Sequence, residues 1–433
     1  MTTVINPRVK KHILGKPHEA VLRFPKGWQD VCLDEVRELI ANPCGPLKFQ
    51  PEVRTEQSAI LVSNIGYRSL LELMFRLRTA RDLLWLIHRG RAGSVGEVIA
   101  QASKVPWELI LPQEFAVALR VTSTASRVFH EGLISEVLCG VLTKAGYRCV
   151  DRKSTCHLID VRLIDNQISF FLSMAGAPLY RRGYKAELRG LAPLKEDIAA
   201  AAVRFTISWA AELLGRDACL PARIYVPFGG SGTLGFETIL YLGSIPSFLF
   251  GRSFSAAAFR CSPSKTIENI QKRLLGVSIE QSFRNSVSSS TQQGHTSRVV
   301  FVEIDKLQAE TLRQNAASFT SKLEETGIVC PGIETIQGSF SEHPPPLNDT
   351  LFIPLNPPYG GRIKDNSKGK QIYGELGEQT KSLAKGRLVY GFLLAPDEQT
   401  QNAFCKHLRS FKQSRRSIIH GGKRIRFVAF LSS

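Results

Sequence analysis

The chain has 433 residues, of which 43% are hydrophobic and 22% are charged. This length excludes one small stapled scaffold and, at about 150 residues per domain, suggests two or three domains. The composition is that of an ordinary globular protein, not of a disordered, collagenous or coiled-coil chain. With 56 Lys and Arg against 38 Asp and Glu, the net charge of +18 favours a polyanion or an anionic surface, and nucleic acid is the leading partner.

Cysteine usage and hydropathy indicate the compartment. The nine cysteines include no C-x-x-C pair, so neither a zinc ribbon nor a disulfide framework is expected. The first 20 residues lack the continuous apolar core of a signal peptide, and no uncharged stretch is long enough to span a bilayer. We therefore expect a cytoplasmic protein without a membrane association.

The N-terminal part is predicted to be a compact α+β region. Strands are expected at 20–24, 58–64 and 115–124 and as two runs within 157–175, and helices at 28–40, 69–87 and 131–146. The long segment 69–87 places its Leu, Met and Phe residues at helical spacing, which favours a helix with core contacts.

The C-terminal part changes character after Gly176. An Ala-rich helix over 193–215 is followed by strands that alternate with helices, which predicts a parallel sheet with crossovers. We expect an extension at 1–17, the α+β region at 18–175 and an α/β domain at 176–433. Surface loops are predicted at 284–297, 343–349 and 363–371, which are polar or Pro-rich.

Residues 223–242 read as an apolar strand, a Gly-rich turn and a helix. This arrangement lets the backbone approach a ligand at the carboxyl end of a strand, with Gly230 and Gly232 as contact points. A tight turn that binds nothing is the alternative.

The next strand, within 298–316, ends in acid before another helix. A carboxylate at that place can accept two hydrogen bonds from ribose hydroxyls, and Glu303 is the first candidate and Asp305 the second. The alternative is that both carboxylates complement the dipole of the helix that follows.

A third strand, within 350–361, leads into Asn356, Pro357, Pro358 and Tyr359. The two prolines hold this loop extended. The Asn356 amide oxygen and the Pro357 carbonyl can then accept both protons of a planar exocyclic amine, while Tyr359 stacks on its base. A plain turn is the alternative for the tetrapeptide alone, but its place after the other two elements favours an amine site.

Four segments in this order resemble the THUMP-domain RNA methyltransferases that make N2-methylguanosine in ribosomal or transfer RNA. They are RRGYKAELRGLAPLKEDIAAAAV (181–203), PFGGSGTLGFE (227–237), VEIDKLQAETLRQNA (302–316) and LNPPYGGRI (355–363). The resemblance covers most of the chain. It implies a Rossmann-like class I methyltransferase domain, with a mostly parallel sheet between helices, preceded by a ferredoxin-like and THUMP RNA-binding region.

The resemblance also implies the chemistry. The enzyme would transfer a methyl group from S-adenosylmethionine to the exocyclic 2-amino group of a guanine in RNA, without a metal. Asn356 would hold or polarise the amine, and the rest of the catalytic motif, Pro357, Pro358 and Tyr359, would shape the base pocket. The residues assigned to the cofactor are Pro227, Gly230, Ser231, Gly232, Thr233, Glu303, Asp305 and Ser339.

The chain departs from the family pattern at three positions. Val226 stands where the family has Asp, Gly229 where it has Cys, and Ser339 where it has an acidic residue near the adenine. These departures motivate an alternative, an inactive RNA-binding or ribosome-assembly protein. Adenine-specific DNA methylation is a third and less favoured hypothesis. The sequence leaves the oligomeric state open, and a monomer is favoured.

The last 33 residues, 401–433, are basic. They contain eight Lys or Arg and no Asp or Glu, with Arg415-Arg416 and Lys423-Arg424 in pairs. Phosphate contact is one interpretation, and a solvated basic face is the other. Arg120, Arg127 and His130 allow the same two interpretations.

Overall fold

The computed structural model describes residues 6–56, 59–151, 156–185, 194–215, 220–287, 298–345, 350–358 and 366–432. The chain forms two compact units. The first comprises Met1–Phe24, Leu33–Leu179 and Arg252–Leu274, and the second comprises Pro25–Cys32, Tyr180–Gly251 and Leu275–Ser433. Both α2 (Gln29–Ala41) and α9 (Ser264–Val287) contribute residues to each unit.

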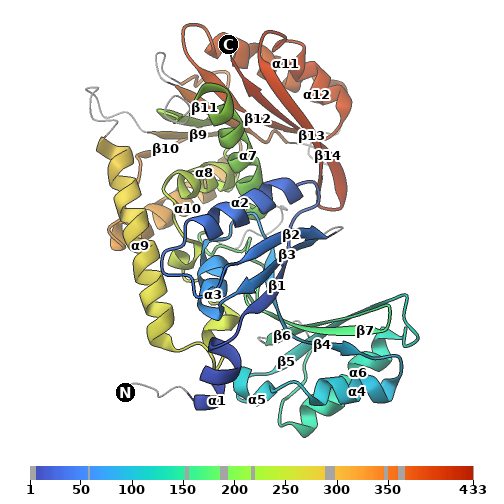
Figure 1. Ribbon diagram of the computed structural model, residues 1–433. Coiled ribbons are helices and arrows are strands. Elements are labelled where there is room, and N and C mark those ends of the chain that lie inside the picture. The colour runs from blue at the N-terminus through green and yellow to red at the C-terminus, as the bar shows by residue number, and fades with distance from the viewer. Residues whose placement is uncertain are drawn as a thin grey trace. The chain divides into compact units, whose positions relative to one another are not determined.

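The first unit contains a seven-stranded sheet in the order β2-β3-β1-β4-β7-β6-β5 (Figure 1). Its neighbouring strands are antiparallel except for the pair β5 and β6. The strands are β1 (His18–Arg23), β2 (Glu52–Glu56), β3 (Ala59–Ile65), β4 (Asp82–Arg91), β5 (Val117–Thr124), β6 (His157–Ile164) and β7 (Gln167–Ser173). The helices are α1 (Pro7–Val9), η1 (Lys10–Leu14), α3 (Tyr67–Arg76), α4 (Val95–Ser103), α5 (Trp107–Ile110), α6 (Glu131–Lys144) and η4 (Ser255–Ala258), and α4 packs beside α6.

The predicted helix over 69–87 is wrong in its second half. Helix α3 ends at Arg76, and residues from Asp82 onward form the buried strand β4. The Glu35 carboxylate accepts hydrogen bonds from the backbone amides of Arg78 and Thr79, which holds the chain in a turn between the two elements. The first four residues of β4 are all buried, and the apolar run that follows Asp82 has no period that separates a strand from a helix.

The second unit contains a seven-stranded sheet in the order β10-β9-β8-β11-β12-β14-β13, parallel except for β14. Its strands are β8 (Arg223–Val226), β9 (Val299–Glu303), β10 (Ile333–Gln337), β11 (Leu351–Leu355), β12 (Val389–Ala395), β13 (Lys412–His420) and β14 (Lys423–Leu431). Its helices are α7 (Glu196–Leu214), α8 (Thr233–Leu242), η3 (Ser247–Phe250), α10 (Lys306–Glu325), α11 (Asn366–Leu383) and α12 (Glu398–Cys405). Helix α11 begins at Asn366, inside the stretch 363–371 that is predicted as a loop. The loop prediction follows from the first turn of the helix, NSKGK, which is polar throughout.

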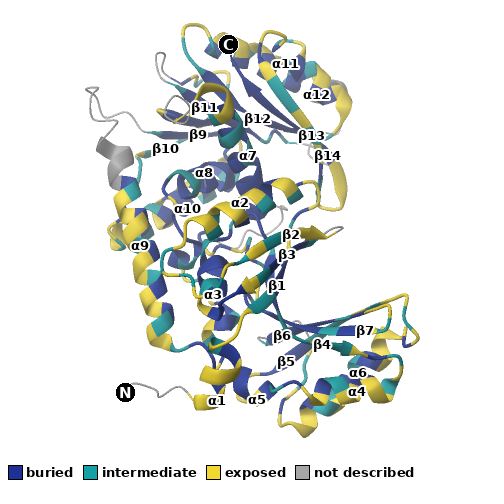
Figure 2. Cartoon of the chain, in the orientation of Figure 1, coloured by how far each residue is buried: buried dark blue, intermediate teal, exposed yellow. Residues whose placement is uncertain are grey.

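Two apolar cores cover the two faces of this sheet. One core joins strand residues to α7, α8 and α10, and the other joins them to α11 and α12. In Figure 2 the strands β9, β11 and β12 are buried, while α10, α11 and α12 expose one side to solvent. The predicted α/β architecture is confirmed. In the described part of the chain, no helix has both the length and the apolar character needed to cross a bilayer.

A buried ion pair joins the segment before α7 to helix α8 in the second unit. The Arg182 Nε atom lies 3.1 Å from Glu237 Oε1 on α8, and both side chains are fully buried. The Tyr184 hydroxyl donates to the same carboxylate oxygen at 2.8 Å. Burial alone would lower the pKa of Arg182, but the Glu237 carboxylate more than reverses this, so that the pKa is raised and the guanidinium stays charged.

We expect Glu237→Gln to destabilise the protein by about 3–5 kcal/mol, because it leaves the buried Arg182 charge without its partner. Urea denaturation of the variant and the parent protein measures this difference. The control is Glu310→Gln, which removes one partner of the exposed pair Arg313–Glu310 on α10 and should cost no more than about 0.5 kcal/mol. Equal losses in the two variants would contradict the assignment of a key role to the buried pair.

The imidazole of His157, the first residue of β6, is buried in an apolar setting. Neither ring nitrogen meets a partner among the residues that the structure describes. The ring lies between Phe115, at a centroid distance of 5.1 Å, and Phe259, at 5.3 Å. Burial in this apolar setting lowers the pKa of His157 to about 4.

Since the folded state resists protonation of His157, the stability that its neutral ring contributes is complete above pH 6.5. It should be lost as the pH falls toward 4, by about 1.4 kcal/mol per pH unit. Burial raises the pKa of Asp82 to about 6, which acts with the opposite sign, so the measurement compares His157→Leu with the parent at each pH. Their difference in unfolding free energy should change across this window. The exposed His12→Leu should give a constant difference, and a constant difference for His157→Leu would refute the prediction.

Candidate active site

The strand order of the second unit reverses between β8 and β11. From β8 the sheet continues to β9 and β10 on one side, whereas β11 and β12 lie on the other. In α/β sheets the carboxyl ends of strands at such a reversal are the usual place for a ligand. Here the Gly-rich turn follows β8, and Asn356 follows β11. The fold thus brings the two predicted motifs to adjacent strand ends.

The Gly-rich turn is shaped by two left-handed glycines. Gly230 has φ +51° and Gly232 has φ +87°, and the Gly232 amide donates to the Gly229 carbonyl at 2.8 Å. A Cβ at Gly232 would lie 2.3 Å from the Phe236 ring, whereas a Cβ at Gly230 would meet no atom within 4 Å. Gly232 is therefore required by the fold, and Gly230 borders open space.

A third glycine, Gly235, lets α8 pack closely on β9. A Cβ there would lie 2.2 Å from Phe301. Together with Gly230 and Gly232 it completes a G-x-G-x-x-G spacing, in which the third glycine serves helix-to-strand packing. The sequence analysis missed Gly235, although this spacing was the signal that identifies it.

Glu303, at the end of β9, is bound to the Gly-rich turn. One carboxylate oxygen accepts from the Gly230 amide at 2.7 Å and the other from the Asp305 amide at 3.1 Å. The residue is 8% exposed. Each oxygen keeps a second lone pair, so the carboxylate can fix the turn and still accept from a ligand hydroxyl.

Asp305 and Ser339, the two other residues predicted near this end of the cofactor site, have different surroundings. Asp305 is the N-cap of α10 and accepts from the Gln308 amide at 2.8 Å, which matches the helix-terminus alternative. Ser339 is half-buried in the loop after β10, and its hydroxyl lies 2.8 Å from that of Ser341. The sequence analysis did not single out Ile304, which is 71% exposed directly beside Glu303. An apolar side chain so exposed at this edge is suited to cover a flat ligand ring.

A side chain of α10 binds the backbone of the Gly-rich turn at Ser231. Asn315, 2% exposed, donates from Nδ2 to the Ser231 carbonyl at 3.1 Å. The hydroxyls of Ser231 and Thr233 lie 3.1 Å apart, at the start of α8. Nothing in the local sequence marks Asn315, because its partner lies 84 residues away.

Asn356 carries the most informative polar atom of the site. Its Oδ1 is buried and meets no hydrogen-bond donor in the described part of the chain. Buried acceptors in proteins are nearly always satisfied, so this oxygen is an open acceptor for a ligand. Pro357 is buried and Pro358 is half-buried beside it. Tyr359, predicted to stack on the base, lies outside the described residues.

Pro354 explains why β8 and β11 separate at this edge. The pairing of β11 with β8 stops at Phe352, whereas its pairing with β12 continues to Leu355. Pro354 has no N–H to donate, and a proline inside a central strand is normally excluded. It lies two residues beyond the last β8 pair, where no hydrogen bond to β8 is required.

Val226 and Gly229 are two positions where the sequence departs from the pattern of the family that it resembles. In this structure both positions contribute to packing. Val226 is fully buried in the core that contains α7 and α8. The Gly229 amide donates to the Val302 carbonyl at 2.9 Å, and a Cβ at Gly229 would lie 2.7 Å from Leu312. Among the described residues, Glu303 and Asp305 are the acids at the ends of β8 and β9.

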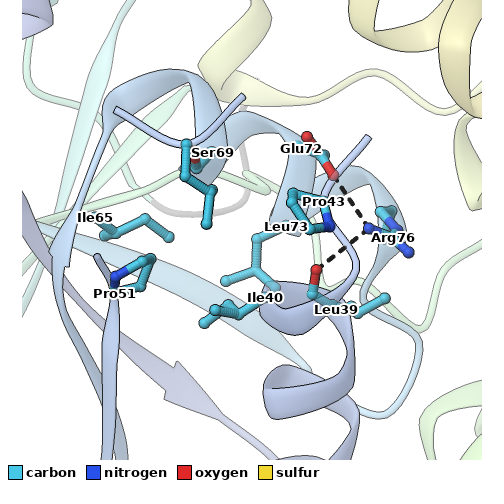
Figure 3. Close-up of a pocket in the computed structure, with 10 residues that line it drawn as sticks. Leu39, Ile40, Pro43, Pro51, Ile65, Ser69, Glu72, Leu73 and Arg76 are labelled. Carbon is cyan, nitrogen blue, oxygen red and sulfur yellow. Dashed lines mark hydrogen bonds and ion pairs between the residues drawn. The ribbon is translucent and has the colours of Figure 1, made fainter. Parts of the chain in front are cut away.

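The first unit contains a pocket that shares no residue with this site. Figure 3 shows it between α2 and α3, lined by Leu39, Ile40, Pro43, Leu47, Pro51, Ile65, Ser69, Glu72, Leu73 and Arg76. Arg76 donates to the Leu39 and Asn42 carbonyls and to Glu72, so its charge serves the end of α2. This pocket is mainly apolar, and its charged pair is internally satisfied.

The basic candidates of the first unit are not equivalent. Arg120 forms an ion pair with the buried Asp160 on the neighbouring strand. His130 is exposed and its ring lies 4.1 Å from that of Phe129, which is also exposed. Arg127 is exposed next to them. Arg120 is thus held by a neighbour, whereas the other two side chains face solvent.

Comparison with known proteins agrees with this geometry. No family model matches the chain. The chain is 22% identical over 397 residues to the putative RNA methyltransferase YpsC of Bacillus subtilis, covering 90% of each protein. It is 24% identical over 339 residues to the ribosomal RNA large subunit methyltransferase K/L of Shewanella frigidimarina, covering 74% of this chain and 42% of that protein. The chain thus spans about two fifths of the K/L relative.

A solved structure shows the fold. SMU.472, a putative methyltransferase complexed with SAH, superposes with a TM-score of 0.71 at 19% identity and covers 96% of this chain and 99% of its own. Together with the strand order, this likeness establishes the class I methyltransferase fold for the second unit.

Proposed function

We propose that this chain is an S-adenosylmethionine-dependent RNA methyltransferase that modifies the exocyclic 2-amino group of a guanine in ribosomal or transfer RNA. The observation that carries the proposal is the buried Oδ1 of Asn356 at the strand reversal, which meets no donor among the described residues and lies next to a Gly-rich turn fixed by Glu303. The names of the relatives, an RNA methyltransferase and a ribosomal RNA methyltransferase, support the RNA substrate.

The residues around the turn fit the proposed cofactor. Pro227, Gly230, Ser231, Gly232 and Thr233 would lie along its methionine part, where Gly230 leaves open space. The free lone pairs of Glu303 would accept from the ribose hydroxyls. Ile304 would cover the adenine, with Asp305 and Ser339 at its rim. The cofactor supplies an electrophilic methyl group on a sulfonium.

Asn356 and Pro357 would prepare the acceptor. Asn356 Oδ1 and the Pro357 carbonyl would accept the two amine protons and so direct the nitrogen lone pair toward the methyl carbon. The nitrogen would take the methyl group that the cofactor supplies, and the proton that the amine gives up would pass to solvent. Pro358 would keep the loop extended and Tyr359 would stack on the base. The rate would come from positioning, with no metal.

The N-terminal part would hold the RNA. We assign residues 18–175 to a ferredoxin-like and THUMP region, 1–17 to an extension and 176–433 to the catalytic domain. An inactive RNA-binding protein remains the alternative because Val226 places an apolar side chain where the family has a carboxylate. Transfer of label from the cofactor separates these two functions.

We expect Asn356→Ala to lower kcat for methyl transfer by at least about 100-fold, because the amine loses a buried acceptor in the transition state. The affinities for RNA and for S-adenosylmethionine should stay within about twofold. The measurement uses isotopically labelled S-adenosylmethionine and undermodified RNA, followed by nucleoside mass spectrometry for labelled N2-methylguanosine.

Asn402→Ala, at an exposed asparagine of α12, is the matched control and should leave the rate unchanged. Full activity of Asn356→Ala would remove this residue from the mechanism. A folded parent protein that binds RNA but yields no labelled nucleoside would favour the inactive alternative.

Glu303→Gln tests the cofactor half of the site. One amide N–H would face the Gly230 or Asp305 amide, and a charged acceptor for the ribose would be lost, so cofactor affinity should fall about tenfold or more. RNA affinity should not change. Calorimetric titration with S-adenosylmethionine measures the first, and Glu334→Gln, at an exposed position of β10, is the control. An unaltered cofactor affinity would exclude Glu303 from the cofactor site.

A further inference from the structure

The basic C-terminal segment contains two arginines that serve the fold. Arg416 on β13 forms a bidentate pair with Asp30, at 3.0 Å for each hydrogen bond, and lies over the rings of Trp28 and Phe205. Arg426 on β14 pairs with Glu398 at 3.1 Å. These two cations are neutralised by nearby carboxylates.

The other six cations of residues 401–433 are exposed: Lys406, Arg409, Lys412, Arg415, Lys423 and Arg424. Lys423 and Arg424 form no ion pair in the described part of the chain. Asp30 on α2 and Glu398 on α12, two acids that face this hairpin, are held by Arg416 and Arg426. This surface therefore keeps its positive charge.

Strand register shows which of these cations lie near the proposed active site. Leu355 of β11 is level with Leu393 of β12, which is level with Val428 of β14. Asn356, one residue further, is therefore level with Phe427. Since β14 is antiparallel to β12, Arg424 and Lys423 extend beyond that level at the carboxyl edge, by roughly 10 Å and 13 Å at about 3.3 Å per residue.

The opposite end of the same hairpin points away from this edge. Lys412 is level with Leu431, four residues from Phe427 in the other direction. Lys406 and Arg409 precede Lys412 in the chain, between α12 and β13. The segment thus offers one exposed pair at the catalytic edge and another of equal charge at the amino edge.

The turn before Lys423 and Arg424 is a two-residue hairpin of defined type. Gly421 and Gly422 have φ +57° and +79°, the left-handed pair of a two-residue type I′ hairpin, and His420 is paired with Lys423. The Ile419 amide donates to the Lys26 carbonyl at 3.2 Å, which adds the exposed Lys26 beside the turn. Lys26, Lys423 and Arg424 are called the edge cations below.

We propose that the edge cations bind the phosphates of the substrate RNA strand a few nucleotides from the target guanine. This inference rests on the proposed function, which supplies RNA as the partner. Lys423 and Arg424 lie on β14, about two strand spacings of 4.8 Å from β11, a distance that a few nucleotides span. Phosphate contacts at this place would position the strand so that the base reaches Asn356.

The test compares two double variants of equal charge change. Lys423→Glu with Arg424→Glu removes the edge cations of the turn, and Lys406→Glu with Arg409→Glu is the matched control at the amino edge. Fluorescence anisotropy with undermodified RNA is measured at several salt concentrations, together with KM and kcat for methyl transfer and the affinity for S-adenosylmethionine.

The edge variant should weaken RNA binding roughly tenfold or more and lower the slope of log K against log salt by about 2, because two phosphate contacts are lost. KM for RNA should rise, with cofactor affinity unchanged. The control should stay within about twofold. Equal effects of the two variants, or none, would overturn the inference while transfer by the parent protein still upholds the proposed function.

If the parent protein binds RNA through the edge cations but transfers no methyl group, the proposed activity fails, and the assignment of these cations to a substrate strand fails with it. Equal loss of binding to duplex DNA of the same length and to RNA would identify a general polyanion surface and overturn the assignment to the substrate strand.

Discussion

The buried pair of Arg182 and Glu237 is the constraint on which the catalytic unit depends. Two charges without solvent are costly unless they are paired and hydrogen-bonded, and here Tyr184 supplies a further bond. The pair fixes the chain before α7 to the middle of α8. Since α8 begins at Thr233, directly after its N-cap Gly232, its position also sets the Gly-rich turn. An interaction in the interior thus determines the geometry of a ligand-facing loop.

The turn is then held from three sides. Gly235 allows α8 to contact Phe301, Asn315 holds the Ser231 carbonyl, and Glu303 accepts from Gly230. Each contact comes from a different element, so none can shift without the others. The acceptor side follows another rule, because at Pro354 strand β11 no longer pairs with β8. The Gly-rich turn therefore lies beside a part of β11 that β8 leaves unpaired.

The order of the three motifs in the second unit was predictable, since carboxyl ends of parallel strands share one edge and the three motifs follow three such strands. Interactions between distant segments were not predictable. The turn that ends α3 depends on Glu35, 43 residues before Arg78, and the role of Arg416 depends on Asp30 and Trp28 at the other end of the chain. The local sequence indicates hydropathy and turn-forming residues. The roles of Glu35 and Arg416 arise only from contacts between segments that lie far apart in the chain.

The open oxygen of Asn356 links stability to selectivity. A buried acceptor that lacks a donor costs about 1–3 kcal/mol, and Asn356 Oδ1 has no donor among the residues that the structure describes. A base that presents an amine would supply that donor, whereas a base that presents a carbonyl oxygen there would add a second acceptor and repulsion. Sites that must pair a buried polar group reject analogues without the partner far more strongly than apolar pockets do. The same atom would therefore select an amine-bearing base and activate it, which leaves the choice of RNA strand to cations at the rim.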